Sequence, residues 1–283
     1  MIYKELEKIV FENRRLGKSD MYIRNLLKEY LQIYVLNFIY TSTQYNKELI
    51  FTGGTCLRHF YDLPRLSEDL DFDYNKIIKS EELLESIKDY FIKKYLFDDI
   101  STSLKQKGNQ ILLKFPVLYS LELASESESE MLYIKIDLQK NPSQNYDSEV
   151  SSKSIRGFNF VAMHYSLSTL MAGKISAILT RDRFIGKNDR KTIKGRDYYD
   201  LLWFIKKRVV PNVARISDIV GEKLTLSEIK RLLDEKVDTL VEKYRNDFES
   251  DLLPLIENEK VVPIYVNNYI DEYKRDVKYL LDM

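Results

Sequence analysis

The chain has 283 residues, of which 44% are hydrophobic and 12% aromatic, so the composition indicates a folded protein and excludes a disordered one. Lysine plus arginine and aspartate plus glutamate both number 44, so any affinity for nucleic acid needs a local basic patch. One cysteine and two histidines exclude an internal disulfide and argue against a structural zinc site.

The first half of the chain predicts helices followed by a mixed α/β region. Residues 1–48 carry apolar side chains at helical spacing, with charges from the fourth residue onward that exclude a secretory signal. The run "ELIFTGG" (48–54) predicts a buried strand that ends in a tight turn, and "TCLRHFYDL" (55–63) a short helix before Pro64. No apolar run approaches the roughly 20 residues that span a bilayer. We therefore expect a cytoplasmic protein without a membrane segment.

Further strands and one helix follow. "DLDFDY" (69–74) alternates polar and apolar residues and predicts a strand, and 80–96 predicts a helix capped by Ser80. Residues 109–123 and 131–139 predict two more strands, joined by the acidic segment "ASESESE", which we expect to be a solvated loop.

From about Tyr165 the pattern becomes almost wholly helical. Helices are predicted over 166–184 and 195–208, and two or three more over 225–283. The change near residue 160 predicts two domains, an α/β core with N-terminal helices over 1–160 and a helical domain over 161–283.

The acids of the second strand have two explanations. Asp69, Asp71 and Asp73 would share one strand face, and such a face can be an exposed edge strand blunted by charge. Alternate residues on a strand lie about 6.6 Å apart, close enough for carboxylates to share metal ions. Asp137, in the later strand, would join them if the two strands are neighbours. Magnesium suits such a site, because it prefers carboxylates and phosphate oxygens.

The turn before the first short helix is a candidate phosphate site. Gly53 and Gly54 allow close backbone approach, and a helix N-terminus offers N–H groups to phosphate. Thr55 adds a hydroxyl, and Arg58 follows one turn later. By contrast, "AGKIS" (172–176) lacks the first glycine and the Ser/Thr of a P-loop and lies inside a helical pattern, so it is excluded as one.

Four segments in order resemble one protein family. The runs "GGTCLRHF", "RLSEDLDFDY", "LSTLMAGKISAILTR" and "GRDYYDLLWF" are similar to the motifs of the AbiEii/AbiGii toxin nucleotidyltransferases, which include the MenT toxins. The resemblance covers about residues 50 to 206. It implies an α+β fold: a mixed-sheet nucleotidyltransferase core like that of DNA polymerase β, with an N-terminal helical segment and a C-terminal helical domain. It also implies Mg²⁺, a nucleoside triphosphate, and a role as the toxin of a toxin–antitoxin or phage-defence pair, with an antitoxin from a neighbouring gene.

The resemblance also assigns roles to residues that match its motifs. It implies that Gly53, Gly54 and Thr55 cradle the triphosphate and that Asp69 and Asp71 bind metal. In the same way Asp137 becomes the third acid, although its surrounding pattern is looser. Asp73 lies outside the motif and is expected to be a solvated neighbour.

Two later residues match the family's lysine and aspartate. Lys174 lies in an apolar helix, where it is either a snorkelling lysine or a triphosphate ligand, with Arg181 on the same face. Asp197 is either a helix cap or an active-site acid, and Asp200 competes for that second role. Gly173 departs from the acid often found before this lysine.

These assignments predict Mg²⁺-dependent transfer of a nucleotide from a nucleoside triphosphate to an acceptor such as the 3′ end of a tRNA. The segment 181–196 holds seven lysines and arginines, and it is either a solvated loop or a clamp for RNA. Nucleotide transfer to a protein hydroxyl and non-catalytic nucleotide or RNA binding remain alternatives. The set of acids argues against a pure binder, and the basic segment favours RNA.

Overall fold

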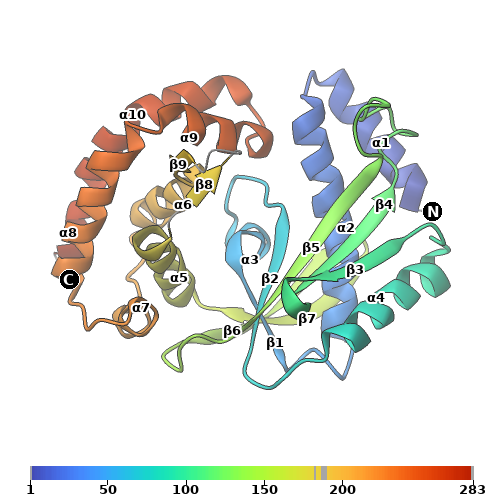
Figure 1. Ribbon diagram of the computed structural model, residues 1–283, viewed down its shortest axis with the longest axis horizontal. Helices are drawn as coiled ribbons and strands as arrows, with labels where there is room; N and C mark the ends of the chain where they lie inside the picture. The colour runs from blue at the N-terminus through green and yellow to red at the C-terminus, as the bar shows by residue number, and fades with distance from the viewer. Residues whose placement is uncertain (1, 182, 186–189, 282–283) are drawn as a thin grey trace. The chain divides into compact units, whose positions relative to one another are not determined.

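The protein is described by a computed structural model over residues 2–181, 183–185 and 190–281. The chain forms two compact units (Figure 1). The first contains the residues up to 141 together with 149–164, and the second contains 142–148 and the residues from 165 onward. Within the basic segment 181–196, residues 182 and 186–189 lie outside the described residues.

A mixed β-sheet forms the centre of the first unit, with described strands in the order β3-β4-β5-β2-β1-β7-β6. In chain order the strands are β1 Leu49–Thr52, β2 Asp69–Tyr74, β3 Ser101–Lys105, β4 Gln110–Pro116, β5 Met131–Lys140, β6 Ser148–Ile155 and β7 Phe158–Tyr165. β2 pairs parallel to β5 and antiparallel to β1, while β4 pairs antiparallel to both β3 and β5. The predicted mixed sheet is therefore confirmed.

Four helices accompany this sheet: α1 Ile2–Arg15, α2 Asp20–Thr41, α3 Gly53–Tyr61 and α4 Ser80–Tyr95. α2 begins at a Ser19 cap that accepts the Tyr22 N–H, and it packs against β5 (Figure 1). The core lies under the apolar faces of the central strands, where Leu70 and Phe72 are buried. Cys56 is also buried, inside α3.

Among its described residues, the second unit is helical apart from two short paired strands, β8 Arg183–Ile185 and β9 Arg190–Thr192. Its α-helices are α5 Leu167–Thr180, α6 Gly195–Lys206, α7 Val213–Val220, α8 Leu226–Lys236, α9 Arg245–Leu252 and α10 Val262–Asp276. α6 packs between α5, α9 and α10, and the buried Tyr269 of α10 donates its hydroxyl to the Tyr198 carbonyl. The predicted helical C-terminal region is confirmed.

Some predicted elements differ from the structure. The strand expected over 109–123 ends at Pro116, and residues 117–123 form turns. Ser80 is the first residue of α4 and not its cap, because the capping position is Lys79, without a side-chain hydrogen bond. β3, β6 and β7 were not predicted.

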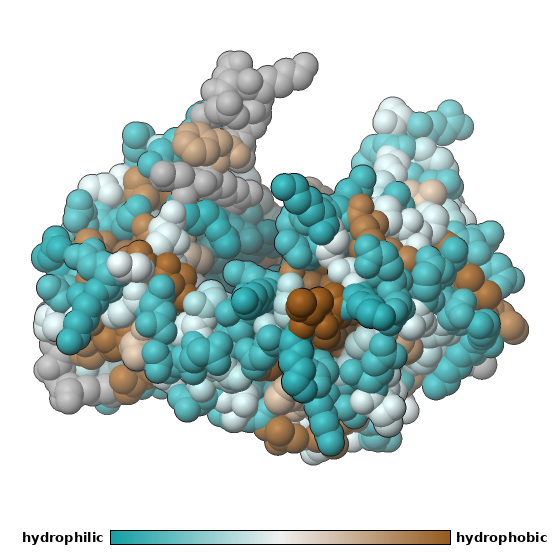
Figure 2. Space-filling model, turned by 60° about the horizontal axis from the view of Figure 1, so that its bottom comes forward, coloured by the Kyte–Doolittle hydropathy of each residue, from teal (hydrophilic) through white to brown (hydrophobic). Residues whose placement is uncertain are grey.

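The surface carries hydrophobic residues in scattered positions, as Figure 2 shows for one face. Isolated exposed hydrophobic residues are normal on folded proteins. Within the described residues, no helix combines the length and apolarity needed to cross a bilayer.

Candidate active site

The paired strands β2 and β5 bring acidic side chains together. Asp71 lies opposite Asp137 in the parallel register, and Asp69 lies opposite Lys135. Partners in a parallel register point to the same sheet face, and residues two apart on one strand do so too. Asp69, Asp71 and Asp137 therefore share a face, opposite the buried Leu70. The prediction that Asp137 joins Asp69 and Asp71 required their two strands to be neighbours, and β2 and β5 do pair.

Neighbouring polar groups contact two of these carboxylates. Gln110 Nε2 donates to Asp137 Oδ1 at 2.7 Å, and Lys135 Nζ lies 3.7 Å from Asp69 Oδ1. These contacts offset part of the repulsion between like charges on one strand face. The sequence gave no reason to single out Gln110, because its contact with Asp137 depends on the pairing of β4 with β5.

Gly53 lies directly against the acidic face. Its φ is +76°, and a Cβ at this position would lie 2.0 Å from Asp71 Oδ2. Both the backbone conformation and the space therefore require glycine. The turn between β1 and α3 thus holds the backbone close to the Asp71 carboxylate.

Gly54 allows a second close approach. A Cβ there would lie 2.7 Å from Ser67 Oγ and 2.8 Å from Arg65 Nη2. Arg65 is 1% exposed and donates to the Leu66 carbonyl, and Ser67 is also buried. Ser67 lies in the family-like run "RLSEDLDFDY", whereas nothing in the sequence indicated that Arg65 packs against the glycine turn.

Thr55 and Arg58, both predicted to bind nucleotide, bind protein groups in this structure. The Thr55 hydroxyl donates to the Asp69 carbonyl and thereby ties α3 to β2. Arg58 Nε donates to Glu29 Oε2 at 2.9 Å, and Nη1 donates to the Leu63 carbonyl at 3.3 Å. Their nucleotide contacts stay predictions.

Asp73 differs from its prediction as a solvated neighbour. It is 6% exposed, so the prediction was wrong. The cause is its position in the middle of the sheet, where Ile50 of β1 and Gln139 of β5 flank it.

In the second unit, Lys174 and Asp197 form an ion-pair cluster. Lys174 Nζ lies 2.8 Å from Asp197 Oδ1 and 2.8 Å from Asp200 Oδ2, and Arg181 Nη1 lies 3.2 Å from Asp197 Oδ2. Burial alone would raise the pKa of the Asp197 carboxyl, but the charges of Lys174, Lys194 and Arg181 outweigh burial and hold that pKa well below its usual range. The cluster brings together four residues that the sequence had singled out.

This geometry excludes the simpler explanations for both residues. The cap of α6 is Lys194, and Asp197 directs its carboxylate to Lys174 and Arg181, so the cap hypothesis was wrong. Lys174 is not a snorkelling lysine either, because its ammonium group binds two buried carboxylates. Its contact with a triphosphate stays a prediction.

The described part of the basic segment is partly neutralised. Arg190 makes two hydrogen bonds to Asp247, at 2.8 and 2.9 Å. Asp251 accepts the Arg196 backbone N–H at 3.0 Å and lies 3.9 Å from its guanidinium. The acids of α9 thus match two of the seven charges that suggested an RNA clamp.

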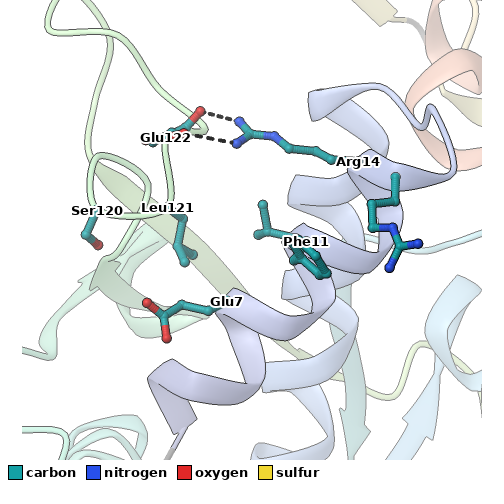
Figure 3. A pocket seen from close by; sticks show the side chains of 8 residues that line it. Glu7, Phe11, Arg14, Ser120, Leu121 and Glu122 are labelled. Carbon is teal, nitrogen blue, oxygen red and sulfur yellow. Dashed lines mark hydrogen bonds and ion pairs between the residues drawn. The ribbon is translucent and has the colours of Figure 1, made fainter.

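A pocket in the first unit lies apart from this chemistry. It has a volume of about 490 Å³ and lies between α1 and the turns after β4, where Phe11 and Leu121 line it and Arg14 donates to Glu122 (Figure 3). None of the predicted site residues lines it.

The acidic face of β2 and β5 fits Mg²⁺ by its donors. All three side chains supply carboxylate oxygens, and the Asp71 carboxylate lies directly against Gly53. Among the described residues, no group of three or more His, Cys, Asp or Glu side chains is arranged to hold an ion by itself. Mg²⁺ typically takes one or two carboxylates and completes its shell with phosphate oxygens and water, so the residues fit a metal bound together with substrate.

Comparisons with known proteins identify the family and the fold of this chain. The model of the AbiEii nucleotidyl transferase toxin of type IV toxin–antitoxin systems matches residues 38–273. The MenT4 nucleotidyltransferase toxin of Mycobacterium tuberculosis is 16% identical, with 98% of each chain covered and a TM-score of 0.52. A Helicobacter pylori protein described as a nucleotidyltransferase is 17% identical, with 91% of this chain and 96% of that chain covered and a TM-score of 0.51. The chain matches no curated protein sequence.

At these identities the two solved structures establish the fold, which is that of nucleotidyltransferases. The family model spans most of the chain, including both the acidic strands and the Lys174 cluster. The protein is therefore a nucleotidyltransferase that belongs to the AbiEii toxin family of type IV toxin–antitoxin systems.

Proposed function

We propose that this protein transfers a nucleotidyl group from a nucleoside triphosphate to an RNA hydroxyl, with the 3′ end of tRNA as the first acceptor to test. The observation that carries the proposal is the register of Asp71 with Asp137, beside the glycine turn at Gly53. This arrangement gathers carboxylate oxygens beside the turn that begins α3, and backbone N–H groups at the start of a helix can donate to phosphate.

The reaction forms a bond between the acceptor oxygen and the α-phosphorus and breaks the bond from that phosphorus to pyrophosphate. Asp69, Asp71 and Asp137 would hold Mg²⁺, which when bound neutralises the developing charge on the attacking and leaving oxygens. Gly53 and Gly54 belong to the turn at the start of α3, whose backbone N–H groups would bind the phosphates. Thr55 keeps that helix fixed on β2 through the Asp69 carbonyl. The acceptor proton passes to solvent. Lys174 and Arg181 supply positive charge for phosphate oxygens.

The change Asp71→Asn tests the catalytic assignment. It removes one negative charge without changing size, so we expect transfer to fall by at least roughly a hundredfold while the protein stays folded. Asp62→Asn is the matched control, because Asp62 is exposed and has a left-handed backbone conformation that Asn tolerates. Full transfer activity in folded Asp71→Asn protein would disprove the assignment.

The acceptor is tested by incubating the protein with each α-labelled nucleoside triphosphate, Mg²⁺, and total cellular RNA or protein. Label in tRNA-sized RNA supports the proposal. Label in protein bands, sensitive to protease and not to ribonuclease, would replace the RNA acceptor with a protein hydroxyl. The same Asp71→Asn variant should lose the growth inhibition that the wild-type toxin causes in the absence of its antitoxin, which we expect a neighbouring gene to encode.

A further inference from the structure

The two faces of the sheet differ in chemistry across β3, β4 and β5. On one face the side chains of β4 and β5 are apolar and buried: Ile111, Leu113, Phe115, Leu132, Ile134 and Ile136. Helix α4 covers this face, with the ring centres of Phe91 and Phe115 5.2 Å apart. The opposite face, which carries Asp137, has accessible side chains on all three strands. An accessible sheet face therefore adjoins the carboxylates of the site.

The strand register sets the order of the accessible side chains. The pairing of β4 with β5 places three pairs of residues in successive rows on this face: Asp137 with Gln110, Lys135 with Leu112, and Tyr133 with Lys114. Because alternate residues on a strand lie about 6.6 Å apart, Tyr133 lies about 13 Å from Asp137 along β5. The face thus leads from the carboxylates to one lysine, and then to an aromatic ring beside a second lysine.

Beyond the carboxylates this face is positively charged. Lys114 and Lys135 project from it, and β3 adds Lys105, which lies opposite Gln110 at the edge of the sheet. Lys135 Nζ lies 3.7 Å from Asp69 Oδ1. Neither Lys105 nor Lys114 forms an ion pair within the part of the chain that the structure describes. Lysines without acidic partners on an accessible surface complement a polyanion such as a nucleic-acid backbone.

The position of this face relative to the glycine turn indicates which substrate it suits. The strand order is β4-β5-β2-β1 and Gly53 follows β1, so the turn and the lysine-bearing strands flank the carboxylates on opposite sides. The proposed function places the phosphates of the nucleoside triphosphate at this turn. In phosphoryl transfer the attacking and leaving oxygens lie roughly in line. An acceptor hydroxyl opposite the leaving pyrophosphate therefore approaches from the side of β5 and β4.

We propose that the accessible face of β3, β4 and β5 binds the single-stranded 3′ end of the RNA acceptor. Lys114 and Lys135 contact its phosphates, and one base stacks on Tyr133. This inference rests on the proposed function and places the RNA on the first unit, not on the basic segment 181–196, whose charges the acids of α9 partly neutralise. Aromatic side chains that stack bases, together with cations along the backbone, are the usual means of binding single-stranded RNA.

Binding of a short, fluorescently labelled single-stranded RNA, measured by anisotropy across a salt series without Mg²⁺ or nucleoside triphosphate, tests the proposal apart from transfer. Lys114→Gln should weaken binding and reduce the slope of log affinity against log salt by about 0.7, because one fewer phosphate is neutralised. Tyr133→Leu should weaken binding at least about fivefold with the slope unchanged, because stacking releases no counterions. Tyr133→Phe keeps the ring and should bind as the wild type does.

Lys88→Gln is the matched control. Lys88 is partly exposed, as Lys114 is, and has no acidic partner among the described residues, but it lies on α4, which covers the opposite face of the sheet. Its replacement should change RNA affinity and the salt slope much less than Lys114→Gln does. Because the side chain of Lys114 is accessible, Lys114→Gln should keep the wild-type melting temperature, which separates loss of binding from loss of folding.

The outcomes distinguish this surface from the proposed function. Wild-type protein that does not bind the RNA would overturn the proposal, as would Lys114→Gln and Tyr133→Leu proteins that bind it as tightly as the wild type does. A loss of affinity in Lys88→Gln equal to that in Lys114→Gln would also overturn it. RNA bound through Lys114 and Tyr133, in a protein whose transfer assay labels only protein, would instead count against the proposed function and leave the RNA-binding surface in place.

Discussion

Position 53 requires glycine for two separate reasons. Its φ is +76°, and a Cβ there would lie 2.0 Å from Asp71 Oδ2. Gly157 has the first constraint alone, with a φ of +79° and nothing within 4 Å of a Cβ. Gly157→Ala should therefore cost only the backbone strain, about 1–2 kcal/mol. Gly53→Ala should cost at least about 2 kcal/mol more in urea unfolding and should abolish transfer.

A second substitution identifies the source of that difference. In an Asp71→Gly background all three side-chain atoms that the new Cβ would meet, Oδ2, Cγ and Cβ of Asp71, are gone. Gly53→Ala should then cost no more than Gly157→Ala does. A difference that persists in this background would show that the constraint at Gly53 comes from another neighbour.

His59 predicts a dependence of stability on pH. It is 5% exposed, its Nε2 has no hydrogen-bond partner among the described residues, and burial together with Lys153 and Arg58 lowers its pKa to about 4 against the opposing charge of Glu29. The unfolded chain takes up a proton near pH 6.5 and the folded protein does not. The free energy of unfolding should therefore fall by up to about 3 kcal/mol as the pH drops from 6.5 to 4.

His59→Leu removes the titrating group and serves as the comparison. Urea unfolding at intervals between pH 7 and pH 4 should give a flatter profile for this variant than for the wild type. Identical profiles would show that His59 does not control stability in this range.

For single residues, the sequence predicted that Asp69 and Asp71 share one strand face, but it did not predict which residues lie beside them. Alternation in β2 was enough to place Asp69 and Asp71 on one face, because the side-chain period of a strand is fixed. The neighbour of Asp71 depended on which strand pairs with β2, and that pairing joins segments more than 60 residues apart. The position of Arg65 was missed because the sequence does not show that this side chain folds back against Gly54.

Among the strands of the sheet, the inner strands β1, β2, β4 and β5 were predicted, whereas the inner strand β7 and both edge strands were not. β5 alternates buried and accessible residues along most of its length, which makes it visible in the sequence. β3 and β6 lie at the two edges of the sheet, and "SEVSSKSI" in β6 contains only two aliphatic residues. An edge strand takes its conformation from backbone pairing with its neighbour, so its own side chains carry little pattern.

Two helical glycines should respond to the same substitution with opposite sign. Gly173, in the middle of α5, is exposed and a Cβ there would meet nothing within 4 Å. Gly173→Ala should stabilise the protein by about 0.5–1 kcal/mol through helix propensity. Gly195 begins α6 against α9, where a Cβ would lie 2.5 Å from Phe248 Cδ2 and 2.8 Å from its carbonyl oxygen, so Gly195→Ala should destabilise it by at least about 2 kcal/mol.

Thermal unfolding of the two variants beside the wild type decides this point. Shifts of the same sign would mean that the packing of α6 on α9 tolerates a methyl group, or that α5 requires glycine at 173 for a reason outside its own helix.

At the scale of the whole molecule, Lys174 should stabilise the second of the two units, in addition to its proposed role in binding phosphate. Lys174→Ala would leave the buried Asp197 and Asp200 without their shared cation, and removing one partner of a buried pair costs about 3–5 kcal/mol. The loss should appear in the fluorescence of Trp203, the sole tryptophan of the chain, which lies in α6 of the second unit.

Lys230→Ala is the matched control within the same unit. It breaks one ion pair with Asp234 at a distance of four residues on α8, which is worth less than about 1 kcal/mol. Equal shifts of the Trp203 transition in denaturant for the two variants would show that the Lys174 cluster contributes no more than a surface pair.

The sequence predicts a change from mixed to helical structure near residue 160 but does not predict the path of the chain there. Residues 142–148 belong with the helical unit, where Asp218 accepts hydrogen bonds from Ser143 and Asn145 and the Thr169 hydroxyl accepts the Asp147 N–H. No shift in composition marks this short excursion, because a few hydrogen bonds to distant residues define it.

The buried position of Cys56 has a practical consequence for studying the enzyme. Burial holds the pKa of its thiol well above the usual value, and only the thiolate reacts with alkylating reagents. Cys56 is the only cysteine, so the native protein should be inert to maleimides while folded. A cysteine introduced at an exposed position, such as Ile77→Cys at a side chain that is 92% exposed, would then be the single site of labelling. A fluorophore can thus be attached to the otherwise unaltered chain to follow nucleotide and acceptor binding in real time.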